Sequence, residues 1–209
     1  MKIRYICFGA LLVFTLAGCA YVQGYLDMAK ERGISEEYNR SLRAWTREMT
    51  AHSQLETRFH ISATYRSPAF NAALLKEQAR VRQWPEARVK EQGEVWLQNV
   101  TTYREFLVYV YTSDREANDF DRRGSIWSVF LKDGRGKQTE PVEIRGVERI
   151  TAEMEAFFPF INKYYGRCYL MKFPAGEEQA ELQLVFASVL GRVALQWEAA
   201  GPSPVAPRR

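Results

Sequence analysis

The sequence is poor in the residues that most often build catalytic and metal sites. It contains three cysteines and two histidines, His52 and His60, in 209 residues. Structural zinc sites use closely spaced pairs of Cys or His ligands, and disulfide-rich scaffolds need several cysteine pairs. The chain has neither pattern, so we expect neither class. The core must therefore form from apolar side chains. With 46% hydrophobic and 13% aromatic residues, a chain of this length has enough of them.

The common catalytic motifs are missing as well. The chain has no Gly-x-Ser-x-Gly, Ser-x-x-Lys or His-Glu-x-x-His segment, which would indicate hydrolases or zinc proteases. Residues 134–137, Gly-Arg-Gly-Lys, lack the spacing of a phosphate-binding loop and precede a predicted strand. We interpret Asp133 to Gly136 as a hairpin turn, and we predict no catalytic residue, no metal and no cofactor.

The two signs of charge are nearly balanced. The chain has 29 Lys and Arg against 25 Asp and Glu, and the two signs are mixed along the sequence, as in residues 76–90. Proteins that bind DNA or RNA usually carry a clustered basic stripe. We therefore predict no nucleic-acid partner.

The first twenty residues have the layout of a bacterial secretion signal. Basic residues near the start precede an uncharged apolar stretch, residues 6–16, and Leu-Ala-Gly-Cys follows at 16–19. This segment resembles the lipobox of bacterial lipoproteins. The resemblance implies cleavage between Gly18 and Cys19, a lipid on the Cys19 thiol and usually an acyl chain on the new amino group. Two or three chains make membrane attachment lasting. Ordinary signal cleavage and an uncleaved anchor are the alternatives.

The residue after the lipobox indicates to which membrane a lipoprotein is sent. Ala20 stands where lipoproteins kept in the inner membrane carry Asp, so the resemblance implies the periplasmic face of the outer membrane, or the cell membrane of a host with one membrane. Cleavage would remove two basic residues and lower the formal charge from +4 to +2. Cys7 would leave with the signal and Cys19 would become a thioether. Cys168 would then be the only free thiol, and no internal disulfide could form.

The periodicity of the mature chain predicts a mainly β fold with helical additions. Segments with alternating apolar and polar residues recur between turns, which is typical of strands with one buried face. We expect a seven-stranded antiparallel β-sandwich of immunoglobulin-like kind, although the Cys pair of antibody domains is absent. Phe106 to Tyr111 is apolar on both faces and indicates a central strand, whereas Pro141 indicates an edge. The seven predicted strands are 59–66, 103–112, 126–131, 138–145, 167–173, 181–187 and 192–197.

Two helical regions are predicted. Ser35 followed by two glutamates is a helix-start signal, and apolar residues at helical spacing continue to about His52. Pro68 fits the first turn of a further helix, so we expect a two-helix insertion after the first strand. The expected organisation is 1–18 signal peptide, 19–34 lipidated tether, 35–54 N-terminal helix, 55–198 sandwich domain with insertion 68–99, and 199–209 loose Pro-rich tail.

Five aromatic residues are crowded into nine positions near Pro159, in a predicted connection. Such a cluster either closes one end of the core or forms a patch for a partner. The five residues are Phe157, Phe158, Phe160, Tyr164 and Tyr165.

Two further groups were weighed as catalytic or metal sites. Cys168 lies on a predicted strand among apolar neighbours, which favours a small core residue over a nucleophile. Residues 114–121 carry oxygen ligands at alternate positions, as calcium loops do. However, Asp119 stands where such a loop needs Gly, and Ser125 where it needs Glu. We interpret this segment as a solvated turn.

These patterns together predict a lipid-anchored envelope protein with a structural, assembly or binding role. The membrane would be contacted through the lipid on Cys19, and the partner would be an envelope protein or a cell-wall component. One alternative is a lipid-anchored hydrolase or metal-dependent enzyme that uses Cys168 or the acidic loop. Another is a carrier of a small hydrophobic ligand, with an apolar pocket between the helical insertion and the sheet.

Overall fold

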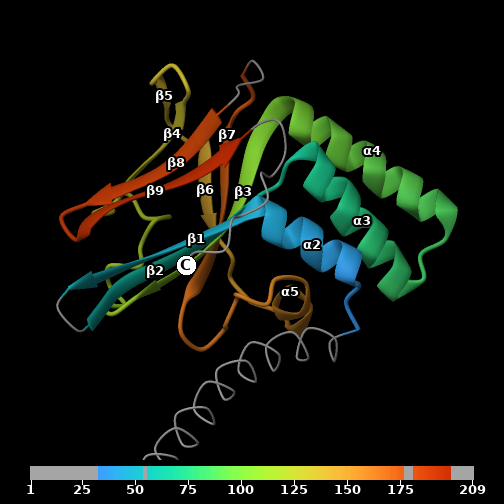
Figure 1. Ribbon diagram of the computed structural model, residues 1–209, viewed down its shortest axis with the longest axis horizontal. Coiled ribbons are helices and arrows are strands. Elements are labelled where there is room, and N and C mark those ends of the chain that lie inside the picture. Colours follow the sequence, from blue (N-terminus) through green and yellow to red (C-terminus); the bar gives the residue numbers. More distant parts are fainter. Residues whose placement is uncertain (1–32, 54–55, 177–180, 199–209) are drawn as a thin grey trace, which may run out of the picture.

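The computed structural model describes residues 33–53, 56–176 and 181–198. Within them, two antiparallel sheets pack face to face, and helices cover the outer face of the larger sheet (Figure 1). The predicted signal peptide, Cys19 and the Pro-rich tail lie outside the described residues.

The larger sheet has the strand order β1-β2-β3-β7-β6, and the smaller sheet has the order β5-β4-β8-β9. All neighbouring strands are antiparallel. The strands are β1 Thr46–Ser53, β2 Glu56–Tyr65, β3 Tyr103–Thr112, β4 Ser128–Asp133, β5 Gln138–Thr139, β6 Glu143–Gly146, β7 Arg167–Pro174, β8 Glu181–Ser188 and β9 Gly191–Glu198.

The helices begin where the sequence predicts starts. The side chain of Ser35 accepts a hydrogen bond from the backbone N–H of Tyr38, and Ser67 accepts one from Phe70 with Pro68 in the first turn. Each cap satisfies a backbone donor that the helix itself leaves without a partner. The helices are α2 Glu36–Trp45, α3 Pro68–Arg82, α4 Glu86–Thr102 and α5 Ala152–Phe157.

The mainly β fold with helical additions is confirmed, but the seven-stranded immunoglobulin-like sandwich is not. The described residues form nine strands. One extra strand arises because the predicted N-terminal helix, 35–54, ends at Trp45, and β1 follows directly and pairs with β2. The apolar Met49 supported a continuing helix, but it is 43% exposed. Pairing with the next strand of the chain overrides helical periodicity here.

The second extra strand comes from the predicted strand 138–145. It is two strands, β5 and β6, which lie in different sheets with Pro141 between them. Proline has no N–H for a ladder, so the chain leaves one sheet at this point and joins the other. The predicted central place of β3 is confirmed, as is the hairpin turn, in which Gly136 has a φ of +85°.

The core has two layers. Between the sheets, aromatic rings from both sides meet, with Trp197 5.2 Å from Phe106 and Phe59 5.2 Å from Trp127 between ring centroids. Between the larger sheet and the helices, a second aromatic group closes the other face. It consists of Tyr38, Phe70, Phe157 and Phe158.

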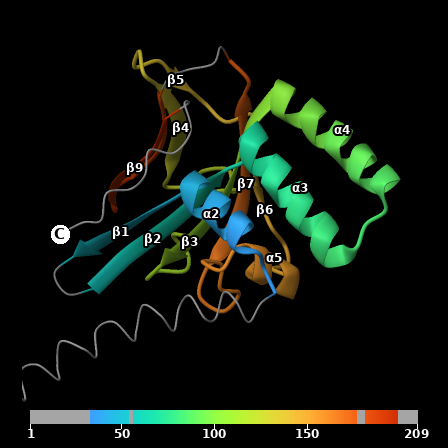
Figure 2. The ribbon, with the colours of Figure 1, turned by 45° about the vertical axis from the view of Figure 1, so that its right-hand side comes forward.

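The helical insertion forms a hairpin that stands out from the sheet (Figure 2). Among the described residues, α4 has none that is buried. It rests on α3 through a half-buried stripe, which contains Val89, Gly93, Trp96 and Val100. A Cβ at Gly93 would lie 3.4 Å from the Leu75 side chain, so the two helices are in contact at this point.

Candidate functional site

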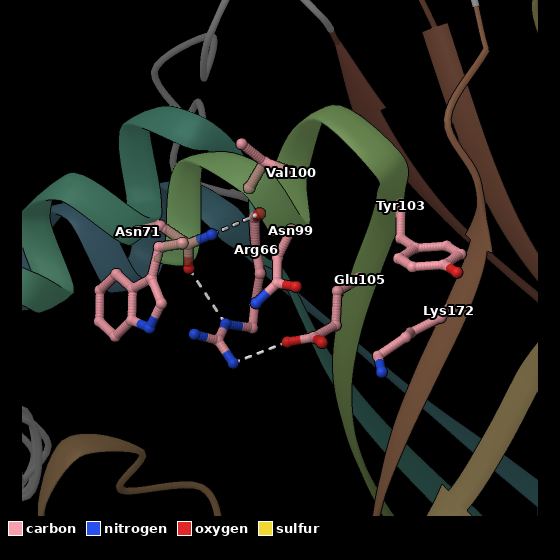
Figure 3. Close-up of a pocket in the computed structure, with 8 residues that line it drawn as sticks. Arg66, Asn71, Asn99, Val100, Tyr103, Glu105 and Lys172 are labelled. Carbon is pink, nitrogen blue, oxygen red and sulfur yellow. Dashed lines mark hydrogen bonds and ion pairs between the residues drawn. The ribbon is translucent and has the colours of Figure 1, made fainter. Parts of the chain in front are cut away.

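A pocket lies where the helical insertion meets the larger sheet (Figure 3). It encloses about 420 Å³ of space, part of it open to solvent. Its lining comes from α3, α4, β3, β7 and the residue after β2. The lining residues are Arg66, Asn71, Trp96, Asn99, Val100, Tyr103, Glu105 and Lys172.

Arg66 organises one wall of the pocket. One of its terminal nitrogens lies 2.7 Å from a carboxylate oxygen of Glu105, and its Nε donates to Asn71 Oδ1 at 3.0 Å. The Asn71 amide in turn donates to the Arg66 backbone carbonyl at 3.1 Å. The guanidinium also lies 5.4 Å from the ring centroid of Trp96, a favourable cation–π distance. This wall is therefore fixed by contacts within the protein.

Lys172 forms the opposite wall. Its ammonium nitrogen lies 2.7 Å from Glu143 and 5.7 Å from the ring centroid of Tyr103. The hydrogen bond from Lys172 lowers the pKa of Glu143 from its usual value. In strand register, Lys172 also stands opposite Glu105. Positive and negative charges thus alternate around the pocket and largely cancel.

The pocket combines these paired charges with aromatic faces and polar groups. Among the described residues, no protein partner is found for the side-chain amide of Asn99, the indole N–H of Trp96 or the hydroxyl of Tyr103. Arg66 and Glu105 each keep one terminal atom outside their mutual ion pair. Donors and acceptors are both present, so the lining suits a polar group. A purely apolar ligand would desolvate these charges at a cost.

The structure places Cys168 in the core. The residue is 1% exposed, and burial, with a smaller contribution from Glu155, raises the pKa of its thiol to about 12. Reactive cysteines need a lowered pKa and access to solvent. At neutral pH Cys168 is therefore a protonated thiol packed between the sheet and the helices.

No Cys-His pair forms between Cys168 and His60. His60 lies on β2 and Cys168 on β7, and β3 separates these strands, which corresponds to roughly 10 Å at the usual strand spacing. The His60 ring is held by Thr50 at 2.8 Å and Ser62 at 2.9 Å. The side chain of His52 lies outside the described part of the structure.

The acidic segment 114–121 is a loop whose side chains are bonded to the surrounding protein. Asp119 accepts a hydrogen bond from Ser125 at 2.8 Å, and Asp121 lies 3.2 Å from Arg167. Asn118 donates to the carbonyl of Val110 at 2.9 Å. Within the described residues, no three Asp, Glu, His or Cys side chains are grouped closely enough to hold a metal ion.

The aromatic segment divides into two parts. Phe157 and Phe158 are 3% and 7% exposed, and Phe160 packs against the core while half-buried. Tyr164 and Tyr165, in contrast, are 71% and 67% exposed. The phenylalanines close the core beneath α2 and α3, and only the tyrosines are accessible to a partner.

The lining of the pocket was not foreseen from the sequence, because Arg66, Trp96, Glu105 and Lys172 come from separate elements. A pocket at this junction was named only in the alternative of a hydrophobic-ligand carrier, as an apolar pocket between the helical insertion and the sheet. The location agrees with the observed pocket, whereas the lining is polar.

Comparisons with known proteins give little further information. No protein-family model and no curated protein matches the chain. A solved structure of a protein of unknown function from Burkholderia pseudomallei K96243 is similar with a TM-score of 0.41 and 10% identity, over 85% of this chain and 89% of that one. A likeness at this level carries no argument about function. In the described part of the chain, no helix has the length and apolar character needed to span a membrane.

Proposed function

We propose that this protein is a lipid-anchored, non-catalytic binding protein of the bacterial cell envelope, held at the periplasmic face of the outer membrane or at the cell membrane of a host with one membrane. The observation that carries the proposal is Leu-Ala-Gly-Cys at residues 16–19, directly after an uncharged apolar stretch. A Cys at this place would be the site of lipid attachment, and Gly18 would precede the cut. The unreactive setting of Cys168 supports a binding role over a thiol enzyme.

Replacement of Cys19 by serine tests the anchor. We expect the wild-type protein to incorporate radiolabelled palmitate and to sediment with membranes, and the Cys19→Ser protein to lose both properties because it lacks the acceptor thiol. Mass spectrometry of the mature N-terminus provides the direct measurement. A mature chain that retains Lys2, or that begins with an unmodified Cys19, would contradict the proposal.

The binding role is assigned to the pocket between α4 and the larger sheet. Its charges are paired within the protein, so it offers no excess charge to an ion. Its aromatic faces and its mixed donors and acceptors match a neutral, hydroxyl-bearing group. A sugar unit of a cell-wall glycan has this chemistry, with apolar C–H faces and a rim of hydroxyls. The pocket is small and open, so it would hold one unit at a time.

Two neighbouring amides of α4 provide a matched pair of variants for the pocket. Asn99 lines the pocket, and Gln98 is another exposed amide on the same helix outside it. Loss of a hydrogen bond to the ligand costs about 0.5–1.5 kcal/mol, so Asn99→Ala should weaken binding about two- to tenfold.

Binding of soluble peptidoglycan fragments to the mature protein can be measured by calorimetry. The Gln98→Ala variant should bind like the wild type, since its side chain does not reach the pocket. Equal weakening by both variants, or absence of binding by the wild-type protein, would remove the glycan assignment and leave the lipid anchor untouched.

A further inference from the structure

Two adjacent tyrosines are the most exposed aromatic residues in the described part of the chain. Tyr164 is 71% and Tyr165 67% exposed. The ammonium of Lys163 lies 5.1 Å from the ring centroid of Tyr164. Tyrosine is enriched at interfaces and at membrane boundaries, because its ring is apolar and its hydroxyl is polar, so this pair is a candidate contact surface.

The turn that carries the tyrosines is rigidly held by the body of the protein. The Asn162 carbonyl accepts a hydrogen bond from Tyr109 at 3.1 Å, and the Asn162 side chain accepts one from the backbone N–H of Tyr164 at 2.9 Å. Lys163 donates its backbone N–H to Glu155 at 3.2 Å. A Cβ at Gly166 would lie 2.5 Å from the carbonyl oxygen of Val110, so the turn is tightly seated on β3. The tyrosines are therefore presented outward with little ordering left to occur on binding.

The same turn lies at the end of the molecule where the chain enters the fold. In Figures 1 and 2, the connection between α5 and β7 and the start of α2 are at the lower end of the molecule. A direct contact links the two regions, because the Tyr38 hydroxyl of α2 donates to the Phe157 carbonyl of α5 at 3.0 Å. Gly33, where the described chain begins, is held there by Arg80.

The length of chain before this point limits what the tyrosines can face. A lipid on Cys19 would be separated from Gly33 by a stretch that spans at most about 50 Å when fully extended. A folded body of this size is roughly 40 Å across, so the stretch keeps the body within about one body diameter of the bilayer. The end at which the chain enters the fold needs the least of this length to touch the bilayer, and the tyrosines lie at that end.

We propose that Tyr164 and Tyr165, with Lys163, seat the protein on the headgroup region of the phospholipid bilayer that carries its lipid anchor. This inference rests on the proposed lipid anchor. Tyrosine rings prefer the boundary between water and hydrocarbon because they combine an apolar face with a hydroxyl. The Lys163 ammonium lies 3.7 Å from Glu155, so its attraction to anionic headgroups is partly offset and the two rings carry most of the contact. The contact would fix the orientation of the pocket relative to the membrane.

Spin labelling of the lipidated protein tests whether the two tyrosines contact the bilayer. The protein is reconstituted into vesicles of phosphatidylethanolamine and phosphatidylglycerol, and a nitroxide is attached to a Tyr165→Cys variant. Cys168 does not compete for the label, because its thiol is buried and its pKa is raised, and Cys19 is blocked by its lipid. A nitroxide on Lys137→Cys provides the control, since Lys137 is exposed near the β4–β5 turn, at the opposite end of the molecule (Figure 1).

On vesicles, the label at position 165 should lose accessibility to a water-soluble nickel complex and keep its accessibility to oxygen, and the label at position 137 should remain accessible to both. An additional Tyr164→Ser change should return position 165 towards aqueous accessibility. Aqueous accessibility at position 165 in protein shown by mass spectrometry to be lipidated would overturn the seating and leave the anchor intact. Protection that persists in detergent without vesicles would indicate a second copy as the occupant and would also overturn it. Absence of lipid from the wild-type protein would overturn both proposals.

Discussion

Replacement of Trp197 by alanine should lower the free energy of unfolding by about 4 kcal/mol, within the range of about 3–5 kcal/mol for large aromatic residues removed from a core. Trp197 is 1% exposed, and its ring lies 5.2 Å from Phe106 and 6.4 Å from Tyr65 between centroids. It brings a strand of the smaller sheet against the centre of the larger one. Its removal leaves a cavity that surrounding strands cannot fill without breaking their ladders.

The indole of Trp197 has a second role. Its N–H donates to the backbone carbonyl of Trp45 at 2.8 Å. Trp45 is the last residue of α2, and carbonyls in the last turn of a helix have no partner within it. Trp197 thereby caps the helix at the point where the chain turns into β1. A Trp197→Phe variant should keep most of the packing and lose this hydrogen bond, at a cost of about 1–2 kcal/mol.

Urea unfolding of the mature protein, followed by circular dichroism, measures both changes. Trp84 offers a matched control. It is half-buried beside the α3–α4 connection, where it contacts the guanidinium groups of Arg82 and Arg88. Because Trp84 lies outside the core, Trp84→Ala should lower the free energy of unfolding by about 1 kcal/mol or less. Similar losses for Trp84→Ala and Trp197→Ala would show that the packing between the sheets does not dominate stability.

Acidification through the range from about pH 4.5 to about pH 2 should remove roughly 3 kcal/mol of stability that depends on the Glu77 carboxylate. Glu77 is 3% exposed. Burial alone would raise its pKa, but hydrogen bonds from Arg80 and from the backbone and hydroxyl of Ser35 outweigh burial and lower the pKa to about 2. The contribution is therefore fully present above the unfolded pKa of 4.5 and is lost as the pH falls through the folded value.

The comparison with Glu77→Gln isolates this residue from the other carboxyl groups. Glutamine keeps the size of the side chain and removes the charge, so the variant should be less stable than the wild type at neutral pH and nearly equal to it near pH 2. Urea midpoints at several pH values give the measurement. If the urea midpoints of the two proteins fell in parallel with pH across this range, the assignment of the lowered pKa to Glu77 would be contradicted.

The same carboxylate holds the start of the described chain, next to the segment predicted to carry the lipid. Its two oxygens accept from the Ser35 backbone N–H and hydroxyl, both at 2.7 Å, and Arg80 joins Glu77 to the carbonyl of Gly33. The start of α2 is thus fixed to α3 by charge-assisted hydrogen bonds, which are stronger than neutral ones. Any force transmitted from a membrane anchor would reach the fold at this well-held point.

Features that depend on neighbouring residues were predictable. Ser35 and Pro68 begin helices because a capping hydroxyl and a fixed φ act within one turn of chain. The apolar residues of β3 indicated a strand buried on both faces, and they lie at the centre of the larger sheet. The lipid anchor also rests on local residues alone, since lipidation would read only the residues around Cys19. It stays a prediction.

Features that depend on contacts between different elements were decided by strand pairing and tertiary packing. Met49 follows Trp45 at helical spacing, yet the chain forms β1, because hydrogen bonds with β2 outweigh a weak local preference. The aromatic segment divides between core and surface according to where α2 and α3 leave room. The pocket brings together Arg66, Trp96, Glu105 and Lys172 from separate elements. Local sequence encodes caps, turns and alternation through short-range sterics and hydrogen bonds, whereas strand partners and pocket walls follow from packing energies summed over the whole chain.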